Sequence, residues 1–127
     1  MKKVISVVLT ILFLVSGLAF ALQKEKIAVA ANGQTPEASV SAQAGRAPFF
    51  LFFDENGKLA EAITNPAKDS QNSGIAVADF LAGKGVTVVV AEAYGPQIVQ
   101  VMKSKRIRAV SFKGSVEEAV KKVLQSK

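Results

Sequence analysis

Residues 74–124 alternate between helix-like and strand-like segments, and few folds accommodate that alternation. Short apolar runs typical of buried strands are separated by stretches whose apolar residues recur at helical spacing. The expected elements are a helix over 74–82, a strand over 87–91, a helix beginning at Gly95-Pro96, a strand over 107–112 and a helix beginning at Ser115. Strands joined through helices run parallel, with right-handed crossovers. This half of the chain therefore predicts parallel strands covered by helices.

Two of the helix starts carry specific local signals. Pro96 stands at the first helical position, where its missing N–H costs nothing. Ser115 and Glu118 have the spacing of a capping box, which satisfies two backbone donors at the start of a helix. The last helix then repeats apolar residues at helical spacing, at Val116, Ala119, Val120, Val123 and Leu124.

The first half of the chain predicts three further strands. The apolar run 27–31 is typical of a strand covered on both faces, and the run 49–53 is the strongest strand signal in the chain. Asn56-Gly57 predicts a hairpin turn, and residues 59–64 then alternate as a strand at or near a sheet edge. The resulting order is β-β-β-α-β-α-β-α. We expect an α/β fold, a three-layer sandwich with a mixed five-stranded sheet.

The absence of two residue types excludes much of enzyme chemistry. The 127-residue chain contains no His and no Cys. It therefore has no disulfide framework, no zinc–thiolate or iron–thiolate site, no Cys nucleophile and no histidine general base. A metal-dependent nuclease on such a sheet would need two or three acids at one sheet end, and the strand 27–31 carries none. We expect a protein that is not an enzyme.

The amino terminus has the organisation of a secretory signal. Lys2-Lys3 is followed by the apolar run 4–19, and Ala19-Phe20-Ala21 supplies the small-x-small pattern of a cleavage site. Cleavage is predicted after Ala21. The protein would then be periplasmic or secreted, with membrane contact only through the signal segment.

An uncleaved anchor is the alternative, because residues 4–22 contain no charge and are long enough to span a bilayer. Cleavage would leave 22–127 as a single domain. Its 14 Lys and Arg against 10 Asp and Glu give a net charge of +4. These charges are scattered, and we expect no nucleic-acid partner.

A ligand groove is expected beyond the carboxyl ends of the parallel strands, where open α/β sheets bind their ligands. Segments 32–46, 92–97 and 113–115 follow three of the strands, and two of them lead into helix N-termini, which favour anions. The prediction is an anionic-ligand groove lined by Arg46, Tyr94, Gln97 and Lys113. In the alternative interpretation the glycines and prolines only form turns, Arg46 pairs with a surface carboxylate and Tyr94 covers the sheet end.

An ordered series of short motifs resembles a known family: Ile27-Ala28-Val29-Ala30, Val40 to Phe50, Asn65-Pro66, Gly85 to Val90, Gly95-Pro96 and Gly114 to Ala119. Over about residues 26–124 the chain is similar to the dinitrogenase iron–molybdenum cofactor-binding domain, the NifX-like group. The resemblance implies a ribonuclease-H-like motif without nuclease activity. It also implies a non-enzymatic carrier of the iron–molybdenum cofactor or its precursor cluster.

The candidate groove comprises eight residues, Gln43, Arg46, Glu92, Tyr94, Gly95, Gln97, Lys113 and Ser115. Many family members have a His where this chain has Gln43. Three hypotheses remain open: a carrier of an anionic metal cluster, a periplasmic binding protein for a small oxyanion such as molybdate, and a protein-interaction module without a small ligand. The third would form a homodimer most simply through edge pairing of 59–64.

Overall fold

The computed structural model describes residues 24–126 of the chain. The predicted signal segment, including the cleavage site at Ala19 and Ala21 and the alternative anchor over 4–22, lies outside the described residues. Within the described part, no helix has the length and apolar character needed to cross a membrane.

The five strands of the described residues form one sheet, in the order β3-β2-β1-β4-β5. The strands are β1 (Ile27–Ala31), β2 (Phe49–Phe53), β3 (Leu59–Thr64), β4 (Val88–Ala91) and β5 (Arg108–Ser111). β2 is antiparallel to both β1 and β3, whereas β1, β4 and β5 run parallel. The predicted mixed five-stranded sheet is confirmed, and β3 lies at its edge as expected.

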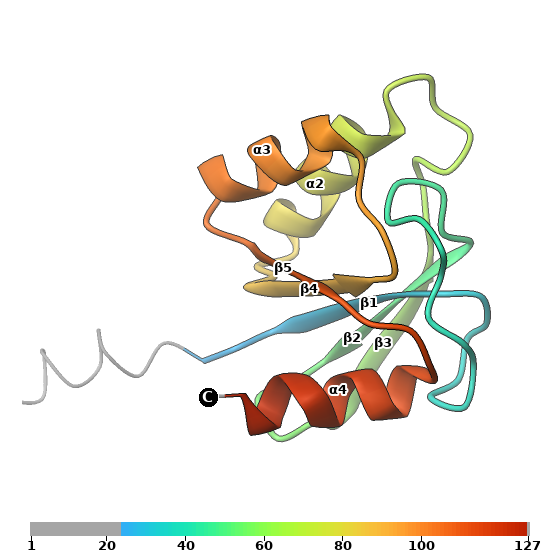
Figure 1. Ribbon diagram of the computed structural model, residues 1–127, viewed down its shortest axis with the longest axis vertical. Helices are drawn as coiled ribbons and strands as arrows, with labels where there is room; N and C mark the ends of the chain where they lie inside the picture. Colours follow the sequence, from blue (N-terminus) through green and yellow to red (C-terminus); the bar gives the residue numbers. More distant parts are fainter. Residues whose placement is uncertain (1–23, 127) are drawn as a thin grey trace, which may run out of the picture.

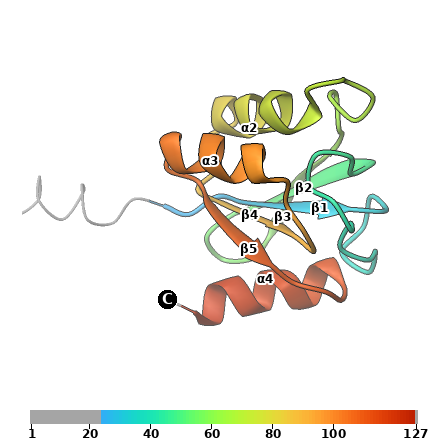
Figure 2. The ribbon, with the colours of Figure 1, turned by 45° about the horizontal axis from the view of Figure 1, so that its top comes forward.

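Within residues 24–126, three helices cover the sheet on both faces: α2 (Ser73–Gly83), α3 (Pro96–Ser104) and α4 (Val116–Gln125). α2 and α3 lie side by side on one face and α4 lies alone on the other, as both ribbon views show (Figures 1 and 2). The molecule is therefore the predicted three-layer sandwich, with the strand order of the ribonuclease-H-like motif.

The apolar strands fill two cores because alternate side chains point to opposite faces of a strand. Phe50 and Phe52 pack under α2 and α3, whereas Leu51 and Phe53 face α4. The five residues of β1 are buried and divide between the same two cores. This explains why β1 and β2 are continuous apolar runs: each is covered on both faces.

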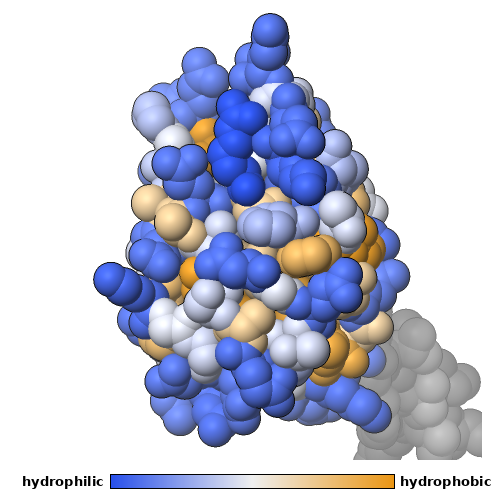
Figure 3. All heavy atoms as spheres, turned by 90° about the vertical axis from the view of Figure 1, so that its right-hand side faces the viewer, coloured by the Kyte–Doolittle hydropathy of each residue, from blue (hydrophilic) through white to orange (hydrophobic). Residues whose placement is uncertain are grey.

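The strand directions place four connections at one edge of the sheet. β3 is antiparallel to β2, which is antiparallel to β1, so β3 runs parallel to β1. The carboxyl ends of β1, β3, β4 and β5 therefore share an edge, on the right in Figure 1. Figure 3 shows the face of the molecule at this edge, where hydrophilic side chains predominate and apolar patches are small.

Candidate functional site

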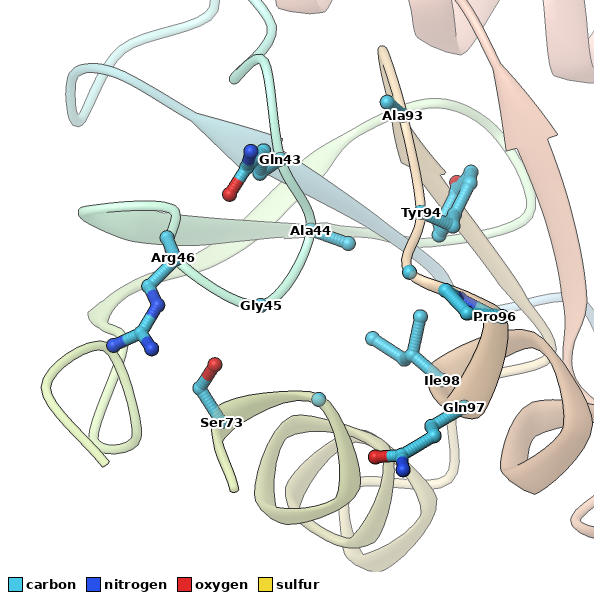
Figure 4. Close-up of a pocket in the computed structure, with 12 residues that line it drawn as sticks. Gln43, Ala44, Gly45, Arg46, Ser73, Ala93, Tyr94, Pro96, Gln97 and Ile98 are labelled. Carbon is cyan, nitrogen blue, oxygen red and sulfur yellow. The ribbon is translucent and has the colours of Figure 1, made fainter. Parts of the chain in front are cut away.

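A cavity of about 410 Å³ opens at the edge where the four carboxyl ends meet. Three segments form it: the loop 43–46, the start of α2 at 73–74, and the connection from β4 into α3 at 93–98 (Figure 4). Its size lies within the range of about 300–1,000 Å³ typical of small-molecule sites. We call this cavity the edge pocket.

Five of the eight predicted site residues line the edge pocket: Gln43, Arg46, Tyr94, Gly95 and Gln97. The remaining three, Glu92, Lys113 and Ser115, lie outside the lining. Glu92 is half-buried, and its backbone N–H donates to the carbonyl of Ser41 at 3.0 Å. Arg46 is consequently the only charged side chain in the lining, and no carboxylate opposes an anion there.

Lys113 and Ser115 are excluded from the pocket because they lead into α4, on the opposite face of the sheet. The start of α4 is also closed to an anion. The N–H groups of Val116 and Glu117 donate to backbone carbonyls at 2.9 Å, and that of Glu118 donates to Ser115 Oγ at 3.1 Å. The capping box predicted from the sequence is confirmed, and together with these two carbonyls it occupies the donors that an anion would need.

The start of α3, in contrast, is open. Its N-cap is Gly95, which has no side chain to cap the helix, and Pro96 has no N–H. The first intrahelical bond runs from Val99 N–H to the Gly95 carbonyl at 3.4 Å. The N–H groups of Gln97 and Ile98 have no partner among residues 24–126. They are available to a ligand, and the helix dipole favours a negative one.

The start of α2 also has backbone N–H groups without partners. The side chain of the N-cap Asn72 makes no capping hydrogen bond, and the first partnered donor is the Ala76 N–H, 3.0 Å from the Asn72 carbonyl. The three preceding N–H groups, at residues 73–75, have no partner in the described chain. Gly74 lets the two helix ends approach, because a Cβ there would lie 3.3 Å from Ile98 Cβ.

The loop that carries Arg46 is held by hydrogen bonds from the connection after β3. Asn65 is buried, and its amide nitrogen donates to the carbonyls of Gly45 at 3.2 Å and Ala47 at 2.9 Å. Arg46 Nη1 donates to the Lys68 carbonyl at 2.9 Å. Within residues 24–126 Arg46 forms no ion pair, so the alternative of a surface carboxylate partner is not what the structure shows.

Tyr94 both lines the pocket and covers the sheet end. Its hydroxyl lies 2.6 Å from the Val110 carbonyl and 3.0 Å from the Val89 carbonyl. Burial raises the pKa of the Tyr94 hydroxyl well above its ordinary value. The hydroxyl therefore stays protonated, joins the connection after β4 to the sheet, and leaves the ring as a wall of the pocket.

Ser73 lies just before the predicted helix 74–82 and is not among the eight predicted site residues. The structure makes it the first residue of α2 and part of the pocket lining. The three predicted strands of the first half, 27–31, 49–53 and 59–64, already indicate its position. When consecutive strands are antiparallel, the third runs parallel to the first. The carboxyl end of 59–64 and the connection 65–72 must then lie at the same edge as the carboxyl end of 27–31.

The donor set of the edge pocket suits the outer atoms of an anion. It combines one guanidinium, free N–H groups from two helices and the side-chain amides of Gln43 and Gln97. No group of three or more Asp and Glu side chains that could hold a metal ion occurs in the described part of the chain. With no His or Cys in the sequence, the pocket has no soft ligand for a bare metal ion.

Comparison with known protein families assigns the chain to one of them. Residues 25–126 match the family described as dinitrogenase iron-molybdenum cofactor. The chain therefore belongs to this family, and the resemblance seen in the sequence motifs is confirmed. No curated protein matches the chain.

Several solved structures are similar. The apo orange protein of Desulfovibrio gigas is 28% identical with a TM-score of 0.75, over 82% of this chain and 90% of that chain. A putative NifB protein from Thermotoga is 26% identical with a TM-score of 0.68, over 80% of this chain and 88% of that chain. A putative dinitrogenase from Methanocaldococcus jannaschii, 11% identical, has a TM-score of 0.59 over 82% of this chain and 91% of that chain, and shares the fold alone.

Proposed function

We propose that this protein is a non-enzymatic binding or carrier domain whose edge pocket holds an anionic iron–molybdenum cofactor or a precursor cluster. One observation carries the proposal: two open helix N-termini and the single charged side chain Arg46 line the same cavity, with no carboxylate among them. Each of these features favours negative charge. Membership of the iron–molybdenum cofactor family supports the identity of the cargo.

The donors of the pocket define how such a cargo would be held. Without His or Cys, the chain has no thiolate or imidazole to enter the coordination sphere of iron or molybdenum. The fit is therefore with a cluster whose metals are already fully coordinated. The protein would bind its outer sulfides and oxygens by N–H and guanidinium hydrogen bonds. Such binding is reversible without ligand exchange at a metal, as a carrier requires.

The test is metal retention by the purified protein under anaerobic conditions. The protein is incubated with an iron–molybdenum cluster donor and desalted, and iron and molybdenum are measured. We expect near-stoichiometric retention by the wild type and its loss in Arg46→Ala. Arg108→Ala is the matched control, because Arg108 is also exposed but lies at the start of β5, outside the pocket. Absence of retained metal in the wild type would overturn the proposed function.

We also propose that the protein is exported, with cleavage after Ala21 and a periplasmic or secreted mature domain over 22–127. The basic start and the small-x-small site support this proposal. Mass spectrometry of the protein recovered from cell fractions tests it. A soluble form beginning at residue 22 is expected, whereas an intact form in the membrane fraction would establish anchoring by residues 4–22.

Protein interaction is a second candidate function, favoured by the free edge of the sheet. β3 has one neighbouring strand, β2, and five of its six residues are exposed. An uncovered edge strand offers backbone donors and acceptors to a strand from another copy. A homodimer formed this way would be lost in Ala62→Pro, because proline removes a donor. Light scattering of the wild type and this variant decides the point.

A further inference from the structure

Ser73 is a buried polar side chain without a partner. It is only 8% exposed, and its hydroxyl makes no hydrogen bond with any residue in the described part of the chain. Figure 4 shows the hydroxyl directed toward Gly45 and the Arg46 side of the edge pocket. The residue is thus largely buried while its oxygen remains open to the pocket, where the hydroxyl is free to donate a hydrogen bond to a ligand.

Further free donors lie at the start of the same helix. The N–H groups of residues 73–75 are unpartnered and begin a helix of 11 residues, α2. Gly45 leaves the hydroxyl accessible, since a Cβ there would lie 3.0 Å from Ser73 Oγ and 3.4 Å from the Gly74 nitrogen. A single methyl group would therefore cover both donors. The space depends on the absence of a side chain at residue 45.

We propose that Ser73 and the start of α2 form a subsite for a tetrahedral oxyanion such as molybdate. The Ser73 hydroxyl and the free N–H groups donate to its oxygens, and Arg46 balances its charge. This inference rests on the proposed function, which makes the edge pocket an anion site. It assigns the oxyanion to one part of that pocket, the start of α2. The oxyanion is either a free ion in solution or a negatively charged oxygen-bearing group of a larger cluster.

The experiment titrates the full protein with sodium molybdate and follows the backbone amides by NMR. Saturable shifts are expected at residues 73–75. Ser73→Ala should weaken molybdate binding about tenfold, the effect of losing one hydrogen bond to a charged group. Gly45→Ala should weaken it at least as much by covering the hydroxyl. Ser104→Ala is the control, because its hydroxyl bonds the Val101 carbonyl in the last turn of α3.

The outcomes separate this inference from the proposed function. Equal affinity of Ser73→Ala and wild type, or shifts at 97–98 with none at 73–75, would overturn the subsite. Retention of the iron–molybdenum cluster to the same extent by Ser73→Ala and wild type, without any molybdate response, would overturn the subsite and leave the proposed function standing. Ser73-dependent molybdate binding without cluster retention would establish the subsite for a free oxyanion and overturn the cluster carrier.

Discussion

The side-chain amide of Asn65 donates a hydrogen bond to the carbonyl of Ala47 at 2.9 Å, from a site that is only 2% exposed. It also reaches the Gly45 carbonyl, so both carbonyls that flank Arg46 are held by one side chain. Its own oxygen accepts the Ala67 N–H at 2.9 Å. The connection after β3 thus sets the position of the loop that carries the charge of the pocket.

Asn65→Leu is expected to lower the free energy of unfolding by about 3 kcal/mol, because it leaves one buried carbonyl, one partly buried carbonyl and one buried N–H unpaired. Urea denaturation measures the change. Asn72→Ala is the control, since Asn72 is exposed and its side chain makes no capping bond. A loss below about 0.5 kcal/mol in Asn65→Leu, the size of an ordinary surface substitution, would contradict the role given to Asn65.

Tyr94→Phe is expected to cost about 1 kcal/mol, since the hydroxyl bond to the Val110 carbonyl is lost while the ring remains. The effect should depend on pH. Because burial raises the pKa of Tyr94 above the value of about 10 for an unfolded tyrosine, the folded state holds its proton longer. Wild-type stability therefore falls as the pH rises above about 10.

The phenylalanine variant lacks this proton and should lose less stability over the same interval. Urea titrations at about pH 8 and about pH 11 compare the two proteins. Parallel losses in both would show that Tyr94 does not contribute to the alkaline transition.

Ser115→Ala should destabilise the protein by about 1 kcal/mol through loss of the helix cap, and leave anion binding unchanged. Hydrogen bonds from the Ser115 backbone N–H and hydroxyl lower the pKa of Glu118. That contribution is present above the unfolded pKa and disappears as the pH falls through the folded one. The variant should therefore show a smaller loss of stability on acidification. Weaker molybdate or cluster binding in Ser115→Ala would return Ser115 to the site.

Two glycine substitutions form a matched pair. A Cβ at Gly95 meets nothing within 4 Å, and its backbone angles of φ −70° and ψ 156° suit any residue. Gly95→Ala should therefore introduce no steric strain and change stability by no more than about 0.5 kcal/mol, because the gain from a less flexible unfolded chain opposes the weaker preference for alanine at an N-cap. Gly45→Ala should cost about 1–2 kcal/mol, because its methyl group lies against Ser73 and Gly74. Thermal denaturation compares them, and equal melting temperatures would contradict the close approach at Gly45.

Local signals account for the success of the element predictions. The strand from Phe49 is recognisable because five consecutive apolar residues need cover on both faces. Gly57 takes a φ of +80° in the predicted hairpin turn, a conformation that favours glycine. The helix starts at Pro96 and Ser115 follow from donors satisfied or missing within a few residues. None of these features needs knowledge of a distant segment.

The candidate site was predicted less completely. Loops after β1 and β4 were expected at the ligand edge, and they supply Arg46, Tyr94 and Gln97. The loop after β5 was expected there too, but its residues lead into α4. Ser73 was not predicted because its position depends on β3. β3 runs parallel to β1, so the connection after β3 reaches the same end of the sheet as the loop after β1.

The sequence by itself determined the mixed sheet, the order of its elements and the loops that follow its parallel strands, because periodicity, turn chemistry and caps act over short distances. Only the tertiary structure decided which helix ends meet. α2 and α3 share one face, with Gly74 against Ile98, so their free N–H groups open on one cavity. α4 packs on the other face, where the carbonyls of Pro36 and Ala38 and the Ser115 cap occupy the donors at its N-terminus. That choice depends on packing between segments far apart in the chain, which no local pattern records.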